Sequence, residues 1–241
     1  MTTTEIVNPN RTARIAGLLY VLMIPLGLLG IMYVPTVLVA PGDTHTTIVN
    51  ILTHMGMFRL TIVTALVVQV VHIFIVLLLY RLLQPVNRSL AKLMVIFMLV
   101  GIPVTMLNEL NHFAIVLLLS GGENLNVLTE DQIQTMVPVF FQLHEYGILI
   151  ASIFWGLWLL PMGYLVFRSG FISKIPGILL IIAGAGYLVD VMARMLSPGY
   201  GETVIATIIT VTLFGEIVFP IWLLIKGVHA EKWKNYQEAV T

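Results

Sequence analysis

The sequence predicts an all-α integral membrane protein, a bundle of six transmembrane helices with both termini in the cytoplasm. Hydrophobic residues make up 59% of the 241 residues and charged residues only 10%, and the mean hydropathy is +0.99. A water-soluble chain of this length could not bury so much apolar surface in one core. Apolar runs of about 20 residues or more recur between short polar segments, and a helix of that length crosses a bilayer.

Charge and cysteine content exclude several classes of function. The net charge is zero and the pI is about 7.0, which argues against nucleic-acid binding and against a polybasic lipid-binding surface. The chain has no cysteine, so disulfides, thiolate metal sites, covalently attached haem and a cysteine nucleophile are excluded. We expect no cofactor, and we expect the lipid bilayer to be the main partner.

The first span is predicted over residues 15–34. This run is too long for the apolar core of a cleaved signal peptide and lacks an Ala-x-Ala-like exit. Pro35 is a natural stop for the helix. In the connection that follows, Asp43 or Thr44 can cap a short helix over 44–56, which we expect to lie in the membrane interface or pack on the bundle.

The second and third spans are predicted over 57–83 and 90–119. The tetrapeptide Gln84-Pro85-Val86-Asn87 between them has the composition of a tight turn. The pair Gly121-Gly122 ends the third span.

The fourth span, predicted over 136–168, belongs to the longest helical stretch. Thr129 and Gln132 have the spacing of a capping box at its start. A single helix from there to Arg168 would be about 57 Å long, well beyond the hydrocarbon thickness of about 30 Å. We therefore expect it to protrude on the outer side, unless Pro138 breaks it first.

The fifth and sixth spans are predicted over 175–196 and 203–225. Pro176 falls in the first turn of the fifth span, where its missing backbone donor costs little. The segment Ser197-Pro198-Gly199 separates the two spans, and a short charged tail follows the sixth. The prediction is one transmembrane domain over residues 1–241.

Basic residues predict the orientation of the bundle. Only Arg59 and Arg194, of the 12 lysines and arginines, fall towards the side opposite the termini. By the positive-inside rule the termini are then cytoplasmic, and the loops after the first, third and fifth spans are outside. Ten basic residues fall on the terminal side: Arg11, Arg14, Arg81, Arg88, Lys92, Arg168, Lys174, Lys226, Lys232 and Lys234.

Six short motifs are distributed from about Arg11 to Gly227, at residues 13–20, 79–88, 143–147, 163–171, 186–190 and 222–227. With these motifs the sequence resembles the prokaryotic membrane family catalogued as domain of unknown function 4386. The resemblance implies a multi-pass membrane protein of a prokaryote, and it brings no settled activity and no catalytic residue. We expect the protein in the cytoplasmic (inner) membrane.

Polar residues within apolar spans are costly, and they usually face the protein interior or water. Counted by the rise per residue, Gln69, His72 and Glu216 share a layer about 12 to 16 Å above the cytoplasmic boundary. A second layer at about 22 to 35 Å holds the remaining candidate ligand-binding residues. These are Glu109, His112, His144, Glu145, Asp190 and Arg194.

Two pairings are expected among these residues. A carboxylate as deep as Glu216 needs a partner, and His72 is the only other ionisable side chain at its level. Three interpretations are open: the pair locks two helices by a structural hydrogen bond, it forms a proton-binding or substrate-contacting site, or the two residues face separate pockets. Asp190 and Arg194 have the i, i+4 spacing of an intrahelical ion pair, although Arg194 could instead serve Glu109 or an anionic ligand.

A bound metal is not expected. Glu109-x-x-His112 has the spacing found in di-iron bundle proteins, but a di-iron site needs two such motifs and the chain has one. By residue type alone, a zinc ion could take its ligands from His112, His144, Glu109 and Asp190. Haem held by two histidines is disfavoured because His72 lies about 16 Å deeper than His112.

Three classes of function remain open from the sequence. The first is a protein that binds or translocates a small or lipid-like ligand through an outward-facing polar vestibule floored by His72 and Glu216. The second is an intramembrane enzyme that acts on a lipid or isoprenoid by acid–base chemistry of its carboxylates and histidines. The third is a structural or accessory membrane subunit without a site. The first is the leading hypothesis.

Overall fold

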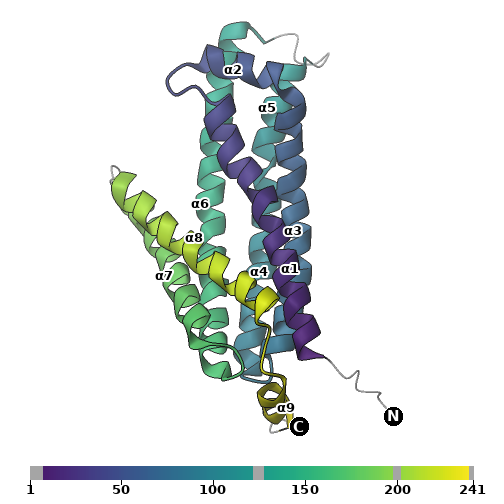
Figure 1. Cartoon of the computed structure of the whole chain (residues 1–241). Coiled ribbons are helices and arrows are strands. Elements are labelled where there is room, and N and C mark those ends of the chain that lie inside the picture. The colour runs from purple at the N-terminus through teal and green to yellow at the C-terminus, as the bar shows by residue number, and fades with distance from the viewer. Residues whose placement is uncertain (1–7, 122–127, 198–201, 239–241) are drawn as a thin grey trace. The chain divides into compact units, whose positions relative to one another are not determined.

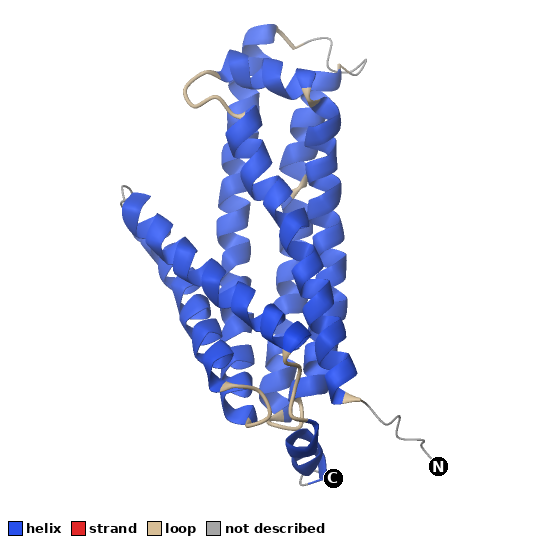
Figure 2. Ribbon diagram, in the orientation of Figure 1, coloured by secondary structure: helices blue, strands red, loops and turns tan. Residues whose placement is uncertain are grey.

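The computed structural model describes residues 8–121, 128–197 and 202–238, without the side chains of 31–32, 202–209 and 211–212. Every regular element in these ranges is a helix and none is a strand, which confirms the all-α class (Figures 1 and 2). The elements are α1 (Pro9–Leu28), the π-helix η1 (Leu29–Leu38), α2 (Thr44–Thr53), α3 (Met55–Leu83), α4 (Arg88–Asn108), α5 (Leu110–Ser120), α6 (Glu130–Ser169), α7 (Lys174–Leu196), α8 (Glu202–Ile225) and α9 (Ala230–Glu238).

Within the described ranges, five helices are long and apolar enough to cross a membrane, or up to six if one bent pair counts as a single span. The bent pair is the end of α8 with α9, which meet at 97°. The five are Pro9–Leu38, Met55–Leu83, Arg88–Ser120, Glu130–Ser169 and Lys174–Leu196. The chain is therefore a multi-pass membrane protein by length and composition, with a sixth span at 203–225 that stays a prediction.

Pro35 behaves differently from the sequence expectation, and the question that the sequence leaves open at Pro138 is answered. Pro35 does not stop the first helix, because the backbone continues through it to Leu38 as the π-helix η1. The wider π-turn closes with Val39 donating from its backbone N–H to Val34 O at 3.1 Å, so the chain passes the proline without losing its last turn. Pro138 does not break α6, which runs for 40 residues without interruption.

Two helix starts follow the capping pattern in the sequence. Thr129 N donates to Gln132 Oε1 at 2.9 Å, and Gln132 N donates to Thr129 Oγ1 at 3.3 Å, which confirms the capping box of α6. Asp43 is the N-cap of α2 and accepts from the backbone and the hydroxyl of Thr46 at 2.9 and 2.6 Å. These bonds from Thr46 favour the charged carboxylate and lower the pKa of Asp43.

The chain divides into two compact units, which are described separately below. Unit 1 consists of Met1–Leu22, His72–Gly101 and Ser152–Thr241, and unit 2 consists of Met23–Val71 and Ile102–Ala151. Several helices contribute one part to each unit. The expectation of a single transmembrane domain stays a prediction.

The core of unit 2 joins η1, α2, α3, α5 and α6. Phe58 is its largest fully buried side chain, and Ile51 of α2 packs into the same cluster. The short helix α2 therefore buries one face against its neighbours, which is why an amphipathic segment of 10 residues is held there. The remaining buried members are Val34, Leu38, Ile115, Leu118 and Val137.

In unit 1, glycines allow three pairs of helices to approach closely. A Cβ added to Gly163 of α6 would lie 2.7 Å from the backbone oxygen of Gly177 in α7, and one added to Gly17 of α1 would lie 2.7 Å from Leu224 N in α8. Gly215 of α8 is packed in the same way against Leu179 of α7, and these two helices run side by side (Figure 1). Small residues at such contacts are typical of membrane helix pairs.

The terminal segments of the described chain are tied to unit 1 by hydrogen bonds. Val228 N, in the segment before α9, donates to Asn10 Oδ1 in the first turn of α1 at 2.9 Å. Trp233 of α9 is buried, and its Nε1 donates to Leu82 O at 2.8 Å. The start and the end of the described chain therefore lie close to each other in unit 1.

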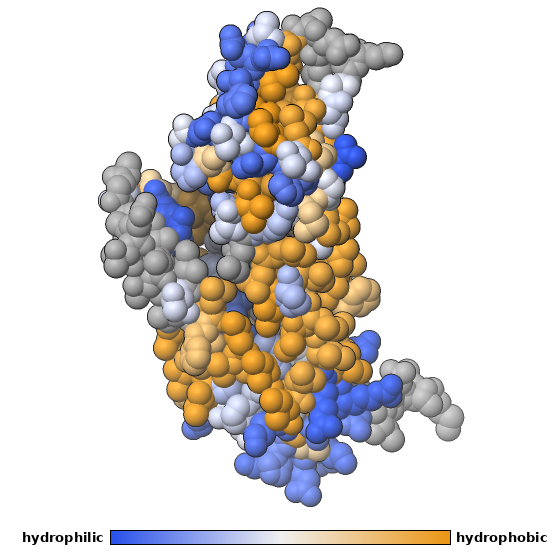
Figure 3. Space-filling view, turned by 45° about the horizontal axis from the view of Figure 1, so that its top comes forward, coloured by the Kyte–Doolittle hydropathy of each residue, from blue (hydrophilic) through white to orange (hydrophobic). Residues whose placement is uncertain are grey.

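Hydrophobic side chains cover much of the surface in the space-filling view (Figure 3). Many large apolar residues are exposed, with values that reach 58% for Phe74 and 64% for Leu107. A soluble protein rarely exposes so much contiguous apolar area, whereas lipid-facing helices require it.

Candidate functional site

Glu109 lies where α4 ends and α5 begins. Its backbone N–H bonds to Met106 O, three residues back, at 3.3 Å, so the helix tightens locally and is divided at this residue. The predicted span over 90–119 therefore consists of two consecutive helices, α4 and α5, which together form the candidate span Arg88–Ser120. The side chains of Glu109 and His112 are both buried, with residue exposures of 4% and 6%.

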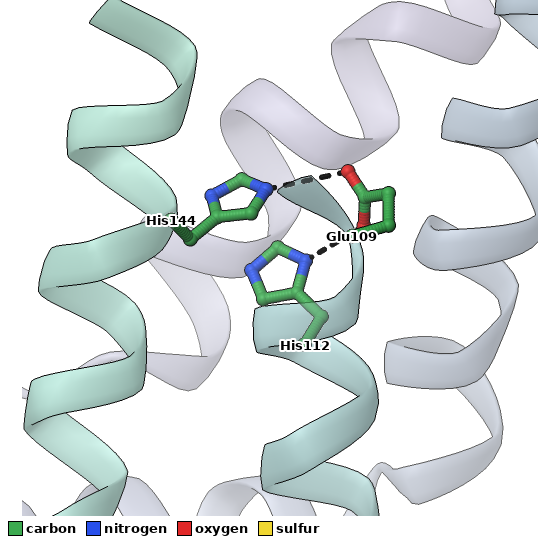
Figure 4. Close-up of side chains that lie close together, drawn as sticks. All are labelled: Glu109, His112 and His144. Atoms are coloured by element: carbon green, nitrogen blue, oxygen red, sulfur yellow. Dashed lines mark hydrogen bonds and ion pairs between the residues drawn. The ribbon is translucent and has the colours of Figure 1, made fainter. Parts of the chain in front are cut away.

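Two histidines converge on the Glu109 carboxylate (Figure 4). His112 Nδ1 lies 2.9 Å from Glu109 Oε2, and His144 Nε2, from α6, lies 3.3 Å from Oε1. The two imidazole rings stack on each other, with centroids 3.7 Å apart and planes inclined by 23°. Each carboxylate oxygen thus has its own nitrogen partner.

The rings are held in place by their surroundings in unit 2. Phe58 and Phe141 each contact the His112 ring edge to face, at centroid distances of 5.2 and 5.9 Å. Asn108 Nδ2 donates to the backbone oxygen of His144 at 2.9 Å and so ties α4 to α6. A Cβ at Gly147 would collide with the Asn108 amide, so only glycine allows this approach.

The Glu109 cluster, defined as Glu109, His112 and His144, therefore brings together three of the candidate residues. Of the described residues, these three form a group of potential metal ligands whose donor atoms all lie within 4.8 Å of one another. Glu145 follows His144 directly but is exposed and has no part in the group. The sequence pattern indicated all three members, but not the stacking of the two rings.

A second polar cluster lies in unit 1, where side chains from α1, α3, α6, α7 and α8 meet. Tyr20 of α1 is buried, and its hydroxyl donates to Glu216 Oε2 of α8 at 3.3 Å. Tyr187 of α7 also interacts with the Glu216 carboxyl group. The other oxygen, Glu216 Oε1, is buried and has no hydrogen-bond partner among the described residues.

His72 of α3 borders the same cluster. Its ring contacts Tyr20 and Trp158 edge to face, at centroid distances of 6.0 and 6.1 Å. Its Nδ1 is buried and has no hydrogen-bond partner in the part of the chain that the structure describes. Tyr20, His72, Trp158, Tyr187 and Glu216 are called the Glu216 cluster below.

The described residues show no hydrogen bond between His72 and Glu216, and the role of the pair stays a prediction. The partner of Glu216 is Tyr20, whose ring also contacts His72. A phenol does not ionise near neutral pH, so Tyr20 does not stand out by charge, but its hydroxyl hydrogen-bonds a carboxyl group well. The sequence does carry a signal for such partners, since the first, fourth and fifth spans each place a tyrosine or tryptophan in the cluster: Tyr20, Trp158 and Tyr187.

The remaining candidates have separate surroundings. Arg194 Nε lies 3.0 Å from the Asp190 carboxylate, which confirms the intrahelical ion pair in α7 and engages both side chains. Asp190 is thus occupied by an arginine rather than free as a metal ligand. Gln69 is buried in unit 2, and its Oε1 has no hydrogen-bond partner among the described residues.

An open groove of about 550 Å³ lies in unit 1, away from the candidate residues. Arg11 and Arg14 line it beside apolar side chains of α1 and α8. None of the residues that the sequence singled out for binding lines this groove. Its other lining residues are Asn8, Asn10, Ile15, Leu18 and Leu224.

Comparison with known proteins identifies the family. The sequence pattern of the family described as "Domain of unknown function (DUF4386)" matches residues 15–227. The chain belongs to the DUF4386 family. This confirms the resemblance inferred from the motifs, and the matched range includes both the Glu109 cluster and the Glu216 cluster.

A relative of this DUF4386 protein occurs in an archaeon. An uncharacterized protein of Archaeoglobus fulgidus is 28% identical to the chain over 169 residues, which cover 69% of the chain and 83% of the archaeal protein. No solved structure matches the chain. These comparisons establish the family, and neither the family description nor the name of the relative states an activity.

Proposed function

We propose that this protein binds or transports a small ligand in the membrane, and that the ligand contacts Glu216 and His72. The proposal rests on two buried polar atoms of the Glu216 cluster, Glu216 Oε1 and His72 Nδ1, which have no hydrogen-bond partner among the side chains that the structure describes. Both residues are neighbours of Tyr20. A buried polar atom without a partner costs about 1–3 kcal/mol, and a bound ligand that supplies the partner would remove that cost.

The surroundings favour a ligand that donates hydrogen bonds. An ionised Glu216 can only accept, and Tyr20 already occupies its other oxygen. The aromatic rings of Tyr20, which bonds the carboxyl group, and of Trp158, which contacts Tyr20, suit a protonated amine or another small cation. A purely structural role for Glu216 and His72 fits less well than ligand binding, because a buried polar group that only links helices normally has a hydrogen-bond partner for each polar atom.

The proposed setting is the cytoplasmic membrane of a prokaryote, with both termini in the cytoplasm. The distribution of basic residues supports this orientation. The hydrogen bond between Asn10 and Val228 supports a shared side for both termini, since it holds the first turn of α1 beside the segment that leads to the C-terminal helix. A polar vestibule that opens outwards is part of the proposal.

Native mass spectrometry of the purified full-length protein tests the proposal. We expect a small-molecule adduct on the wild type. In Glu216→Gln the occupancy of this adduct should fall at least tenfold, because the amide keeps an acceptor for Tyr20 but removes the charge. His72→Phe should also lower the occupancy of the adduct, because phenylalanine keeps the ring contacts but lacks the ring nitrogen. Glu145→Gln, an exposed carboxylate in α6, is the matched control and should bind as the wild type does.

An adduct that persists unchanged in Glu216→Gln and His72→Phe would contradict this assignment. A wild type that carries no small molecule under gentle activation would contradict it as well. Fragmentation of the adduct identifies its class, so a lipid, an amine and a metal ion are told apart in one measurement.

A further inference from the structure

We propose that Glu109, His112 and His144 bind one divalent transition-metal ion. The cluster offers two imidazoles and one carboxylate, a ligand set that suits zinc and iron(II) and leaves positions open for water or substrate. This inference concerns unit 2 and does not depend on the proposed role of Glu216. It also departs from the sequence expectation that no metal is bound.

The distances from each nitrogen to its carboxylate oxygen lie in the range of a metal site, and the stacked rings must turn about their Cβ–Cγ bonds to aim both lone pairs at one ion. Bonds of about 2.0–2.2 Å from zinc to nitrogen and oxygen place neighbouring ligand atoms about 3.0–3.4 Å apart, for angles between 90° and tetrahedral. The corresponding separations in the cluster are 2.9 Å for His112 Nδ1 to Glu109 Oε2 and 3.3 Å for His144 Nε2 to Oε1. One donor atom from each of the three residues can be chosen so that all three lie within 4.8 Å of one another.

Charge gives a second argument. Glu109 is a buried carboxylate in an apolar span, beside His112 and the phenyl rings that pack on it. With both histidines neutral, the cluster would hold an uncompensated negative charge, which is costly in a membrane span. A dication changes the net charge of the cluster from −1 to +1, and a hydroxide at one of the open positions brings it to zero. Binding of the ion requires a lone pair on His112 Nδ1 and on His144 Nε2, so each ring then carries its proton on the other nitrogen.

The structure also provides access and support. The His144 side chain is 17% exposed, against 8% for His112 and 6% for Glu109, so the cluster opens on the His144 side. An ion and an additional water ligand would enter there. Asn108 holds the backbone at His144, and Phe58 and Phe141 fix the His112 ring, which is how outer residues orient metal ligands.

Zinc and cobalt(II) binding to the full-length protein in detergent tests the proposal. The protein is stripped with EDTA, reloaded with Zn²⁺ and freed of excess ion, and the metal content is measured by plasma mass spectrometry. We expect one zinc per chain in the wild type. We also expect affinity, from competition with a chromophoric chelator, to fall more than about 100-fold in Glu109→Gln and His144→Gln, because even outer-shell changes cost about 10–100-fold.

Two variants serve as matched controls. Glu145→Gln alters the exposed carboxylate next to His144, and His45→Gln alters an exposed histidine, so both should bind zinc as the wild type does. Glu109→Gln should remain folded, because its amide can accept from His112 and donate to His144. Its thermal unfolding without metal checks this. Cobalt(II) should give visible ligand-field bands in the wild type that Glu109→Gln lacks.

A wild type that retains no more zinc or cobalt than Glu109→Gln would overturn the proposal and leave the cluster as a hydrogen-bonded network only. Equal loss of metal in Glu145→Gln or His45→Gln would overturn it too, since surface chelation would then explain the binding. Glu216→Gln should keep its full metal content, so failure of the metal site and failure of the proposed ligand site are separate results.

Discussion

Tyr20 occupies a central position among single residues of unit 1. Its hydroxyl bonds Glu216, and its ring contacts both His72 and Trp158. A phenol can satisfy a buried carboxyl group without introducing a second charge, which is an advantage in an apolar span. One buried side chain therefore contacts three members of the cluster.

His72 gives a prediction about stability. In the ligand-free protein, His72→Phe should raise the free energy of unfolding by about 1 kcal/mol, because the buried Nδ1 has no described partner and the edge-to-face ring contacts are kept. Unfolding in a titration with sodium dodecyl sulfate measures the change. His45→Phe, at an exposed histidine, should leave stability nearly unchanged. A loss of stability in His72→Phe would mean that Nδ1 has a partner in the folded protein.

At the scale of helices, α6 and α7 depend on glycine at their contact. Gly163 meets Gly177, and Gly156 meets Gly184, so the two backbones touch where a larger residue would force them apart. Dispersion contacts between closely packed backbones are a main source of helix association in membranes, where lipid is as apolar as leucine. The contact thus fixes how α7 presents Tyr187 and Asp190.

Substitution of these glycines tests the contact. Gly163→Ala should destabilise the protein by about 1–3 kcal/mol, because the new Cβ would lie 2.7 Å from Gly177 O and 2.9 Å from Ile181 N, and backbone atoms cannot move aside cheaply. Gly27→Ala in α1 is the control. No atom lies within 4 Å of its added Cβ, and alanine is the better helix former. Equal effects of the two changes in the same detergent titration would disprove the packing argument.

At the scale of the whole chain, orientation in the membrane can be measured directly because the protein has no cysteine. In intact spheroplasts, His45→Cys should react with a membrane-impermeant maleimide, and Ser89→Cys should react only after permeabilisation. Both positions are exposed, so accessibility to reagent depends on the side of the membrane. The opposite labelling pattern would invert the proposed topology.

Much of the fold could be predicted from the sequence because lipid imposes long apolar helices. The capping box at Thr129 and the ion pair of Asp190 with Arg194 were equally accessible, since both depend on local spacing. Contacts between distant segments were harder to predict. The division of the helix at Glu109 and the π-turn through Pro35 arise from backbone adjustments that have no periodic signature.

The candidate site was predictable to a similar degree. Glu109 and His112 share a helix face by their spacing, and a count of heights placed His144 near them. Their close approach depends on the pairing of α4 with α6 through Asn108 and Gly147, which no local pattern reveals. Tyr20 was missed because its contribution is a hydrogen bond rather than a charge.

The bond from Trp233 to Leu82 joins residues 151 positions apart in the sequence. Leu82 O belongs to the last turn of α3, whose carbonyls have no partner further along the helix. The indole of Trp233 therefore caps the C-terminal end of α3, which lies much earlier in the sequence. Loss of the C-terminal segment would remove this bond and fray the end of α3, while the contacts between the transmembrane helices stayed intact. An affinity tag is therefore better placed after Glu238 than as a replacement for α9.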